Sequence, residues 1–213
     1  MRITVFGAAG QVGRAVVEEA VSRGHIVTAV VRNPAHLNDL PTNALARTGD
    51  ALKIGDVLMI SADQDVVINA TRSATSDINE VTRTTRTLMD GLAQTGVRLL
   101  VVGGAASLSV PGAGNRTVVD SPEFLPPSLR QVGLASIAQF NICTAETRVD
   151  WAYLSPPARL TPGKRTGRYR LGRDELLLDE DGDSRITIDD LAVVLLDEAE
   201  NPRHHRARFT AAY

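Results

Sequence analysis

The feature that most constrains this chain is a turn with three evenly spaced glycines, FGAAGQVG at residues 6–13. An apolar run ends at Gly7, and a helical pattern begins at about Gln11 and ends at Gly24. Small residues let the backbone approach a phosphate closely, and the free N–H groups and positive dipole of a helix start can receive its charge. The turn therefore predicts a strand, a pyrophosphate-binding loop and a helix, followed by a second strand that ends near Arg32.

The glycine spacing leaves an alternative open. It is G-x-x-G-x-x-G, not the G-x-G-x-x-G of the usual dinucleotide fingerprint. The glycines could instead serve an ordinary strand–turn–helix connection that needs a positive φ and close packing. The binding loop is favoured because strand and helix patterns keep alternating along the rest of the chain.

This alternation predicts the fold class. We expect further strands at about 45–48, 65–71, 97–104, 151–155 and in the final RARFTAAY, with helices at about 77–95, 131–147 and 190–199. The strand DVVINAT is apolar through most of its length, which is typical of a central parallel strand covered on both faces. We therefore predict one α/β domain over residues 1–213, with a doubly wound, mainly parallel sheet.

The end of the second predicted strand bears on the choice of dinucleotide. An NAD enzyme often has Asp or Glu there to bind the ribose hydroxyls, whereas this chain has Arg32 and Asn33, with no carboxylate before Asp39. A guanidinium pairs well with a 2′-phosphate, and Arg14 could assist it. Two solvated surface arginines are the alternative. We expect NADP as the cofactor, with NAD possible.

Asp50, at the end of the third predicted strand, has two interpretations. Its carboxylate could accept a hydrogen bond from the adenine amino group, or it could be the N-cap of the next short helix. The residues alone favour neither.

Composition excludes several classes of protein. A net charge of −2 and 4% aromatic residues give no case for binding nucleic acid or an anionic membrane. One cysteine, Cys143, permits neither an intrachain disulfide nor a cysteine metal cluster, and we expect no metal. Neither a signal peptide nor an apolar stretch of membrane-spanning length is evident. We expect a cytoplasmic monomer or homodimer whose partners are small molecules.

Residues 158–188 differ in character from the rest, since they hold a basic cluster and then an acidic one. The sequence LLLDEDGDSRITI predicts two short strands about an Asp181-Gly182 turn, so we expect a hairpin and loops on the substrate side of the sheet. Thr187 and Asp190 follow the S/T-x-x-[DE] pattern that opens a helix.

The order of these motifs resembles the NAD(P)H-binding atypical short-chain dehydrogenases/reductases, and within them the small proteins often described as NADH-flavin reductases. The resemblance covers nearly the whole chain and rests on FGAAGQVG, VVRNP, GD at 49–50, DVVINAT, LLVVGGAASL, VDWAYLSPP, RTGRYRLG and SRITIDDLAVVLLDEAENP. It implies a Rossmann-like fold with a small C-terminal extension on the substrate side.

The resemblance also implies the cofactor contacts. It assigns the pyrophosphate to Gly7, Ala9, Gly10, Gln11 and Val12, the ribose phosphate to Arg32, the adenine to Asp50, the nicotinamide side to Asn69, Ala70 and Thr71, the floor to Gly103 and Gly104, and the carboxamide to Pro156.

The chain departs from the family pattern at the catalytic pair. Classical members use Tyr-x-x-x-Lys on the helix after the fifth strand, but the predicted helix at 131–147 contains neither residue type. Tyr153 is followed four residues later by Pro157, and Tyr169 by Arg173. The resemblance therefore implies a hydride acceptor that needs no such acid, namely a flavin or quinone bound as a substrate and not held tightly.

Two residues are candidates for positioning that acceptor. Ser107 could orient it from the loop after the fifth strand, or be a plain loop serine. Tyr169, with Arg168 and Arg170, could close over an anionic substrate, or belong to a solvated basic hairpin. The main hypothesis is an NAD(P)H-dependent oxidoreductase. A non-catalytic NADP(H)-binding sensor is the alternative, and a nucleotide-sugar epimerase or dehydratase is a third hypothesis.

Overall fold

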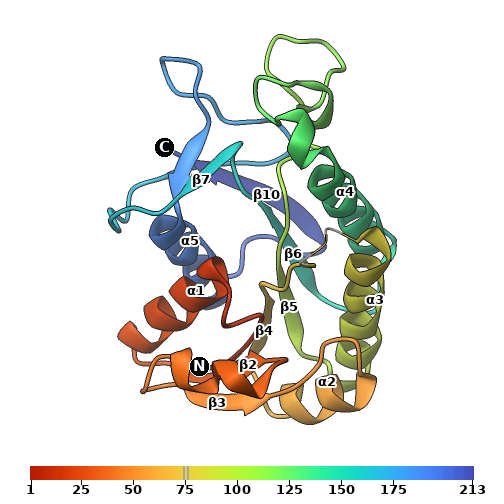
Figure 1. Cartoon of the computed structure of the whole chain (residues 1–213), viewed down its shortest axis with the longest axis vertical. Coiled ribbons are helices and arrows are strands. Elements are labelled where there is room, and N and C mark those ends of the chain that lie inside the picture. Colours follow the sequence, from red (N-terminus) through yellow and green to blue (C-terminus); the bar gives the residue numbers. More distant parts are fainter. Residues whose placement is uncertain (74, 76) are drawn as a thin grey trace.

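One sheet of eight strands runs through the middle of the molecule (Figure 1). The computed structural model describes residues 1–213 except Ala74 and Ser76. The strands are β1 Arg2–Phe6, β2 Ile26–Val31, β3 Leu45–Thr48, β4 Val66–Asn69, β5 Arg98–Val102, β6 Trp151–Ser155, β8 Arg170–Gly172 and β10 Ala207–Ala212. Their order is β3-β2-β1-β4-β5-β6-β10-β8, and only the β10–β8 pair is antiparallel. The predicted doubly wound, mainly parallel, Rossmann-like α/β fold is confirmed.

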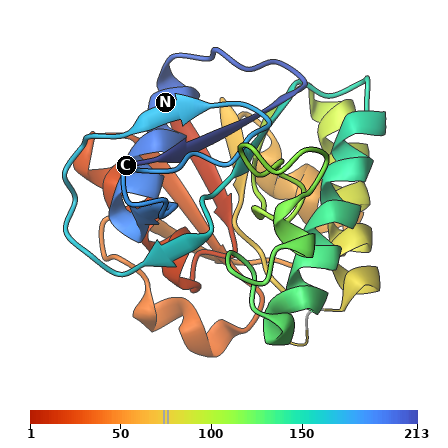
Figure 2. The same cartoon turned by 90° about the horizontal axis from the view of Figure 1, so that it is seen from above.

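Helices cover both faces of this sheet. Helices α1 Gln11–Ser22 and α5 Ile188–Glu200 lie on one face, and α2 Ile54–Ser61, α3 Ile78–Thr95 and α4 Arg130–Ala145 lie on the other (Figures 1 and 2). Short 3₁₀ helices occur at η1 Pro34–Asp39, η2 Val118–Asp120 and η3 Pro127–Leu129. Every residue of the central strand β4 is buried, as its sequence predicts.

The core divides into two layers because successive strand residues point to opposite faces. Ile3 and Val5 of β1 pack toward α1 and α5, whereas Phe6 packs with Val67 of β4 toward α2 and α3. The two faces are thus held by separate sets of side chains.

Local signals placed most helix ends correctly. Gly24 follows α1 in the left-handed conformation, with φ +80°. The Thr187 side chain accepts a hydrogen bond from the N–H of Asp190 and caps α5, as predicted. Asp50, however, is not the N-cap of the helix after β3. That position belongs to Lys53, and the Asp50 carboxylate accepts from the N–H of Leu52 at 3.0 Å.

The predicted hairpin about Asp181-Gly182 is wrong. The turn exists, since Gly182 has φ +77° and the N–H of Asp179 donates to the carbonyl of Asp183 at 2.8 Å. The strand after it, β9 Arg185–Thr187, pairs in parallel with β7 Arg159–Thr161 and not with the segment before the turn. The favourable partner lies far away in sequence, so the local pattern does not reveal it.

Candidate functional site

A groove of about 890 Å³ lies at the carboxyl ends of β1 and β4, where the strand order reverses. This is the place where open α/β sheets bind ligands. Its walls come from the glycine turn, the ends of β2 and β3, the segment after β4 and the first turns of α3: Gly7, Ala9, Gly10, Gln11, Val12, Arg32, Asn33, His36, Asp50, Ala51, Ala70, Thr71, Arg72, Ser73, Glu80, Val81 and Thr84 are among them.

The three glycines of the turn have different roles. Gly7 has φ +82°, and a Cβ there would lie 2.6 Å from the carbonyl oxygen of Ala70. A Cβ on Gly13 would lie 2.2 Å from the carbonyl oxygen of Gly7, so both positions serve the close packing of the turn. Gly10 has φ −74°, and its nearest neighbour would be at an ordinary 3.4 Å. Only at Gly10, therefore, does packing within the protein give no reason for glycine.

The start of α1 is open to an anion. It has no side-chain cap, and no acidic residue occurs in its first turn. The N–H groups of a first helical turn have no partners within the helix, and the helix dipole adds positive potential. The uncapped turn, with Gly10 facing the groove, fits a dinucleotide pyrophosphate.

Arg32 and Asp50 both line the end of the groove nearest β2 and β3, as the adenosine assignment requires. The structure adds an acid that the sequence did not suggest. The Arg32 guanidinium donates to the Glu80 carboxylate of α3 at 2.8 Å. Arg14 does not join this end, because its side chain pairs with Glu18 on the surface of α1.

The opposite end of the groove is partly apolar. Ala70 and Thr71 line it, joined by Leu160 of β7 and Ile188 at the start of α5. Four other residues assigned to this side are not among the lining residues: Asn69, Gly103, Gly104 and Pro156. Asn69 is buried and supports the wall indirectly, because its carboxamide oxygen accepts from the N–H and hydroxyl of Thr71 at 3.1 and 2.6 Å.

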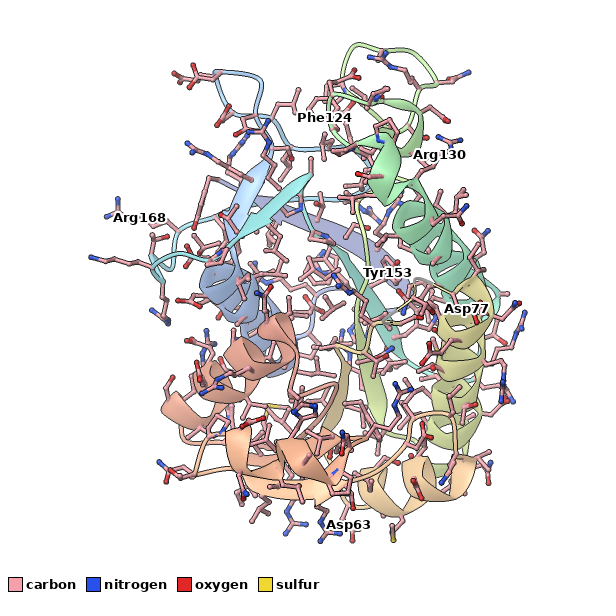
Figure 3. All side chains as sticks on the ribbon, in the orientation of Figure 1. Asp63, Asp77, Phe124, Arg130, Tyr153 and Arg168 are labelled. Carbon is pink, nitrogen blue, oxygen red and sulfur yellow. The ribbon has the colours of Figure 1, made fainter. Side chains whose placement is uncertain are left out.

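Gly103 makes room for a tyrosine, and Gly104 makes room for the side chain of Ser136. A Cβ on Gly103 would lie 2.0 Å from the ring of Tyr153, which is fully buried near the centre of the molecule (Figure 3). The Tyr153 hydroxyl donates to the carbonyl of Ser136 at 3.0 Å and accepts from the N–H of Gly104 at 3.3 Å. Burial raises the pKa of Tyr153 far above its usual value, so this phenol is a poor proton donor.

The structure does not bring Ser107 and Tyr169 together at the groove. The Ser107 hydroxyl accepts from the Arg208 guanidinium at 2.8 Å. The Tyr169 hydroxyl bonds to the Asp197 carboxylate on α5, and burial together with that bond raises the pKa of Tyr169 to about 12. Arg168 points away from the molecule (Figure 3). Neither candidate lines the groove.

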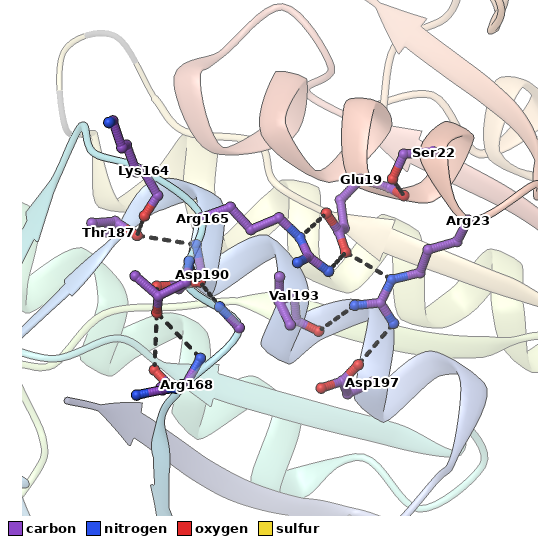
Figure 4. A network of polar contacts seen from close by, with 12 residues as sticks. Glu19, Ser22, Arg23, Lys164, Arg165, Arg168, Thr187, Asp190, Val193 and Asp197 are labelled. Atoms are coloured by element: carbon purple, nitrogen blue, oxygen red, sulfur yellow. Dashed lines mark hydrogen bonds and ion pairs between the residues drawn. The ribbon is translucent and has the colours of Figure 1, made fainter.

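A polar network anchors the segment after β7 (Figure 4). Arg165 donates to both oxygens of the Glu19 carboxylate on α1, at 2.8 and 2.9 Å. The Asp190 carboxylate on α5 accepts from the N–H groups of Thr166 and Gly167, each at 2.7 Å. The loop is therefore tied to two helices, next to the strand that carries Leu160.

Sequence reasoning missed the groove residues that come from distant parts of the chain. Glu80 and Thr84 come from α3, and Leu160 and Ile188 come from the segment around the β7–β9 pair. Glu80 lies in the first turn of the helix that follows β4, so its place near the strand ends could have been expected, although its pairing with Arg32 could not. Only the unexpected β7–β9 pairing explains Leu160.

The described part of the chain shows neither a membrane-spanning helix nor a cluster of metal ligands. None of its helices combines the length and apolar character that crossing a membrane requires. No group of three His, Cys, Asp or Glu side chains in it is placed to hold a metal ion.

A family model and several known proteins match this chain over nearly its whole length. The model of a family described as NAD(P)H-binding matches residues 7–202. The uncharacterized protein YwnB of Bacillus subtilis is 36% identical over 99% of this chain and 97% of its own length. A solved candidate epimerase from Bacteroides thetaiotaomicron is 36% identical, with a TM-score of 0.89 over 100% of this chain and 96% of that one.

A second solved structure, a candidate NADH-flavin reductase from Streptococcus pneumoniae, is 30% identical. Its TM-score is 0.85, over 100% of this chain and 99% of that chain. The family model supports an NAD(P)H-binding protein, while the two solved relatives are described as enzymes of different reactions, one an epimerase and the other a reductase.

Proposed function

The chain belongs to the NAD(P)H-binding family, and we propose on that basis that it transfers hydride from NADPH to a flavin- or quinone-like acceptor. The observation that carries the proposal is the groove at the switch point of the sheet, with an uncapped helix start and Gly10 on its wall. Gly7, Ala9, Gln11 and Val12 complete the pyrophosphate loop, and Arg32 and Asp50 would hold the adenosine end.

The choice of acceptor follows from the acids near the groove. Neither Tyr169 nor Tyr153 is a good proton donor, because Tyr169 is bound to Asp197 and Tyr153 is buried. A general acid works best when its pKa lies near the operating pH, and neither meets that condition. A flavin or quinone accepts hydride without a protein acid at the reacting atom. The cofactor supplies the hydride, and the protein would orient the two rings.

The remaining assigned residues have supporting roles in this proposal. Ala70 and Thr71, with Asn69 behind them, would flank the nicotinamide, and Gly103, Gly104 and Pro156 would lie behind that end of the groove. Ser107 and Tyr169 are proposed only as outer contacts for the acceptor, since neither lines the groove.

The test is a turnover assay. Purified protein is mixed with NADPH or NADH and a panel of free flavins and quinones, and the absorbance of the reduced nicotinamide is followed. Oxidation that depends on both protein and acceptor supports the reductase. Tight NADPH binding without turnover on any acceptor would favour the alternative, a non-catalytic NADP(H)-binding sensor. The absence of the Tyr-x-x-x-Lys pair from the predicted helix at 131–147 is equally compatible with such a sensor.

A further inference from the structure

An ion pair between Arg32 and Glu80 joins two walls of the groove at its adenosine end. Arg32 directly follows β2, and Glu80 lies in the first turn of α3, so the two side chains come from different walls. Their Nη1 and Oε1 atoms are 2.8 Å apart. Arg32 keeps 61% of its side chain exposed and can turn toward a ligand, whereas Glu80 is exposed by only 26%.

The carboxylates at this end of the groove oppose the binding of a 2′-phosphate. The pKa of Glu80 is lowered by a hydrogen bond with Ser73 and by the Arg32 guanidinium, so Glu80 is ionised at neutral pH. The nearby Asp50 adds a second carboxylate to the field around Arg32. The imidazole of His36, which also lines this end, contacts Asp39 at 3.1 Å. An arriving 2′-phosphate would therefore find each of these two basic side chains already paired with an acid.

The adenosine ribose of NADH carries a 2′-hydroxyl in place of the 2′-phosphate. Its 2′-hydroxyl donates a hydrogen bond and carries no charge, so it can approach a carboxylate without displacing Arg32. In many dinucleotide-binding proteins the acid that receives this hydroxyl stands at the end of the second strand. That position is empty of acids here, but Glu80 reaches the same end of the groove from α3.

We propose that Glu80 is a specificity-determining residue that competes with the 2′-phosphate for Arg32 and so narrows the preference for NADPH over NADH. The inference rests on the proposed function, because it requires a dinucleotide in this groove. Removing the charge of Glu80 should release Arg32 for the phosphate. Because the Arg32 partner is largely exposed, solvent screens the pair, and the expected effect on affinity is modest.

The experiment compares the wild type with Glu80→Gln, Arg32→Ala and the double variant, together with one control variant. Dissociation constants are measured for NADPH and NADH by titration calorimetry at one ionic strength. The fragments 2′,5′-ADP and 5′-AMP are titrated as well, because they report on the adenosine end alone. Glu123→Gln is the matched control, since Glu123 pairs with Arg116 at the same 2.8 Å but does not line the groove.

We expect Glu80→Gln to tighten NADPH and 2′,5′-ADP three- to tenfold, with NADH and 5′-AMP changed less than twofold. In the Arg32→Ala background the gain should fall below twofold, because no guanidinium remains to be released. Unchanged NADPH affinity in Glu80→Gln, or a gain that persists without Arg32, would overturn the inference while leaving the proposed function intact. A wild-type protein that binds neither dinucleotide would overturn both.

Discussion

Gly10 offers the sharpest test of the binding groove, because its glycine is not required by packing. Replacement by Val places the new side chain in the groove beside the free N–H groups of the α1 start, while the backbone angles of φ −74° and ψ 160° suit any residue. If the side chain prevents two hydrogen bonds to the pyrophosphate, at about 1.5–3 kcal/mol each, binding should weaken more than a hundredfold.

The same substitution should hardly affect folding. Loss of the glycine N-cap should lower the free energy of unfolding by less than about 1 kcal/mol. Valine also reduces the conformational entropy of the unfolded chain, which raises the free energy of unfolding by a similar amount. The melting temperature should therefore stay within about 4 °C of the wild type. Gly13→Ala is predicted to behave in the opposite way, since its Cβ would lie 2.2 Å from the carbonyl oxygen of Gly7 and destabilise the turn itself.

The assay measures NADPH affinity by titration and melting temperature by circular dichroism for each variant. Gly55→Ala on α2 is the control, because its Cβ would have no neighbour within 4 Å and the position lies outside the groove. Wild-type affinity in Gly10→Val would refute the assignment of the turn to the pyrophosphate. A Gly10→Val protein that fails to fold would show that this glycine is structural after all.

Three further outcomes are expected. Arg32→Ala should weaken NADPH about tenfold and NADH less than twofold in paired titrations, because a largely exposed guanidinium contributes one charge-assisted contact; equal losses would contradict this. Tyr169→Phe should leave NADPH oxidation within twofold of wild type, since its hydroxyl is bound to Asp197 outside the groove. For Asp190, burial opposes ionisation, but hydrogen bonds from Thr166 and Tyr213 and backbone N–H groups outweigh it and lower its pKa. The stabilisation is therefore present above the unfolded pKa of about 4 and is lost as the pH falls through the folded value, so Asp190→Asn should flatten the acid limb of the stability profile measured by urea unfolding.

The features that were predicted correctly from the sequence depend on residues close together in the chain. The glycine turn, the Thr187 cap and the buried strand β4 each depend on residues within a few positions of one another, so their chemistry is visible in the sequence. The carboxyl ends of β1 and β4 could be placed together because parallel strands share an edge of the sheet.

Contacts between distant segments could not be read in the same way. Glu80 is 48 residues from Arg32, and no local pattern shows which side chain on α3 will meet the end of β2. Leu160 reaches the groove through the pairing of β7 with β9. The sequence instead predicted that the β9 segment would form a hairpin with the residues before the Asp181-Gly182 turn. The long-range partner, and not the local propensity, decided each of these cases.

The end of the groove that we propose for the acceptor is lined in part by residues whose place the sequence did not predict. Within the described chain, the residues that reach it from the C-terminal segment are Leu160 and Ile188, neither of which can give or take a proton. The loop beside them is tied to α1 by the ion pair of Arg165 with Glu19, and to α5 by hydrogen bonds from backbone N–H groups to the Asp190 carboxylate, so this apolar wall is held in place at two points. A wall of that kind selects a substrate by shape and apolar contact, which suits the flat ring of a flavin or quinone better than a sugar whose hydroxyls need polar partners. The C-terminal segment therefore argues for the reductase over the epimerase on grounds independent of the missing Tyr-x-x-x-Lys pair.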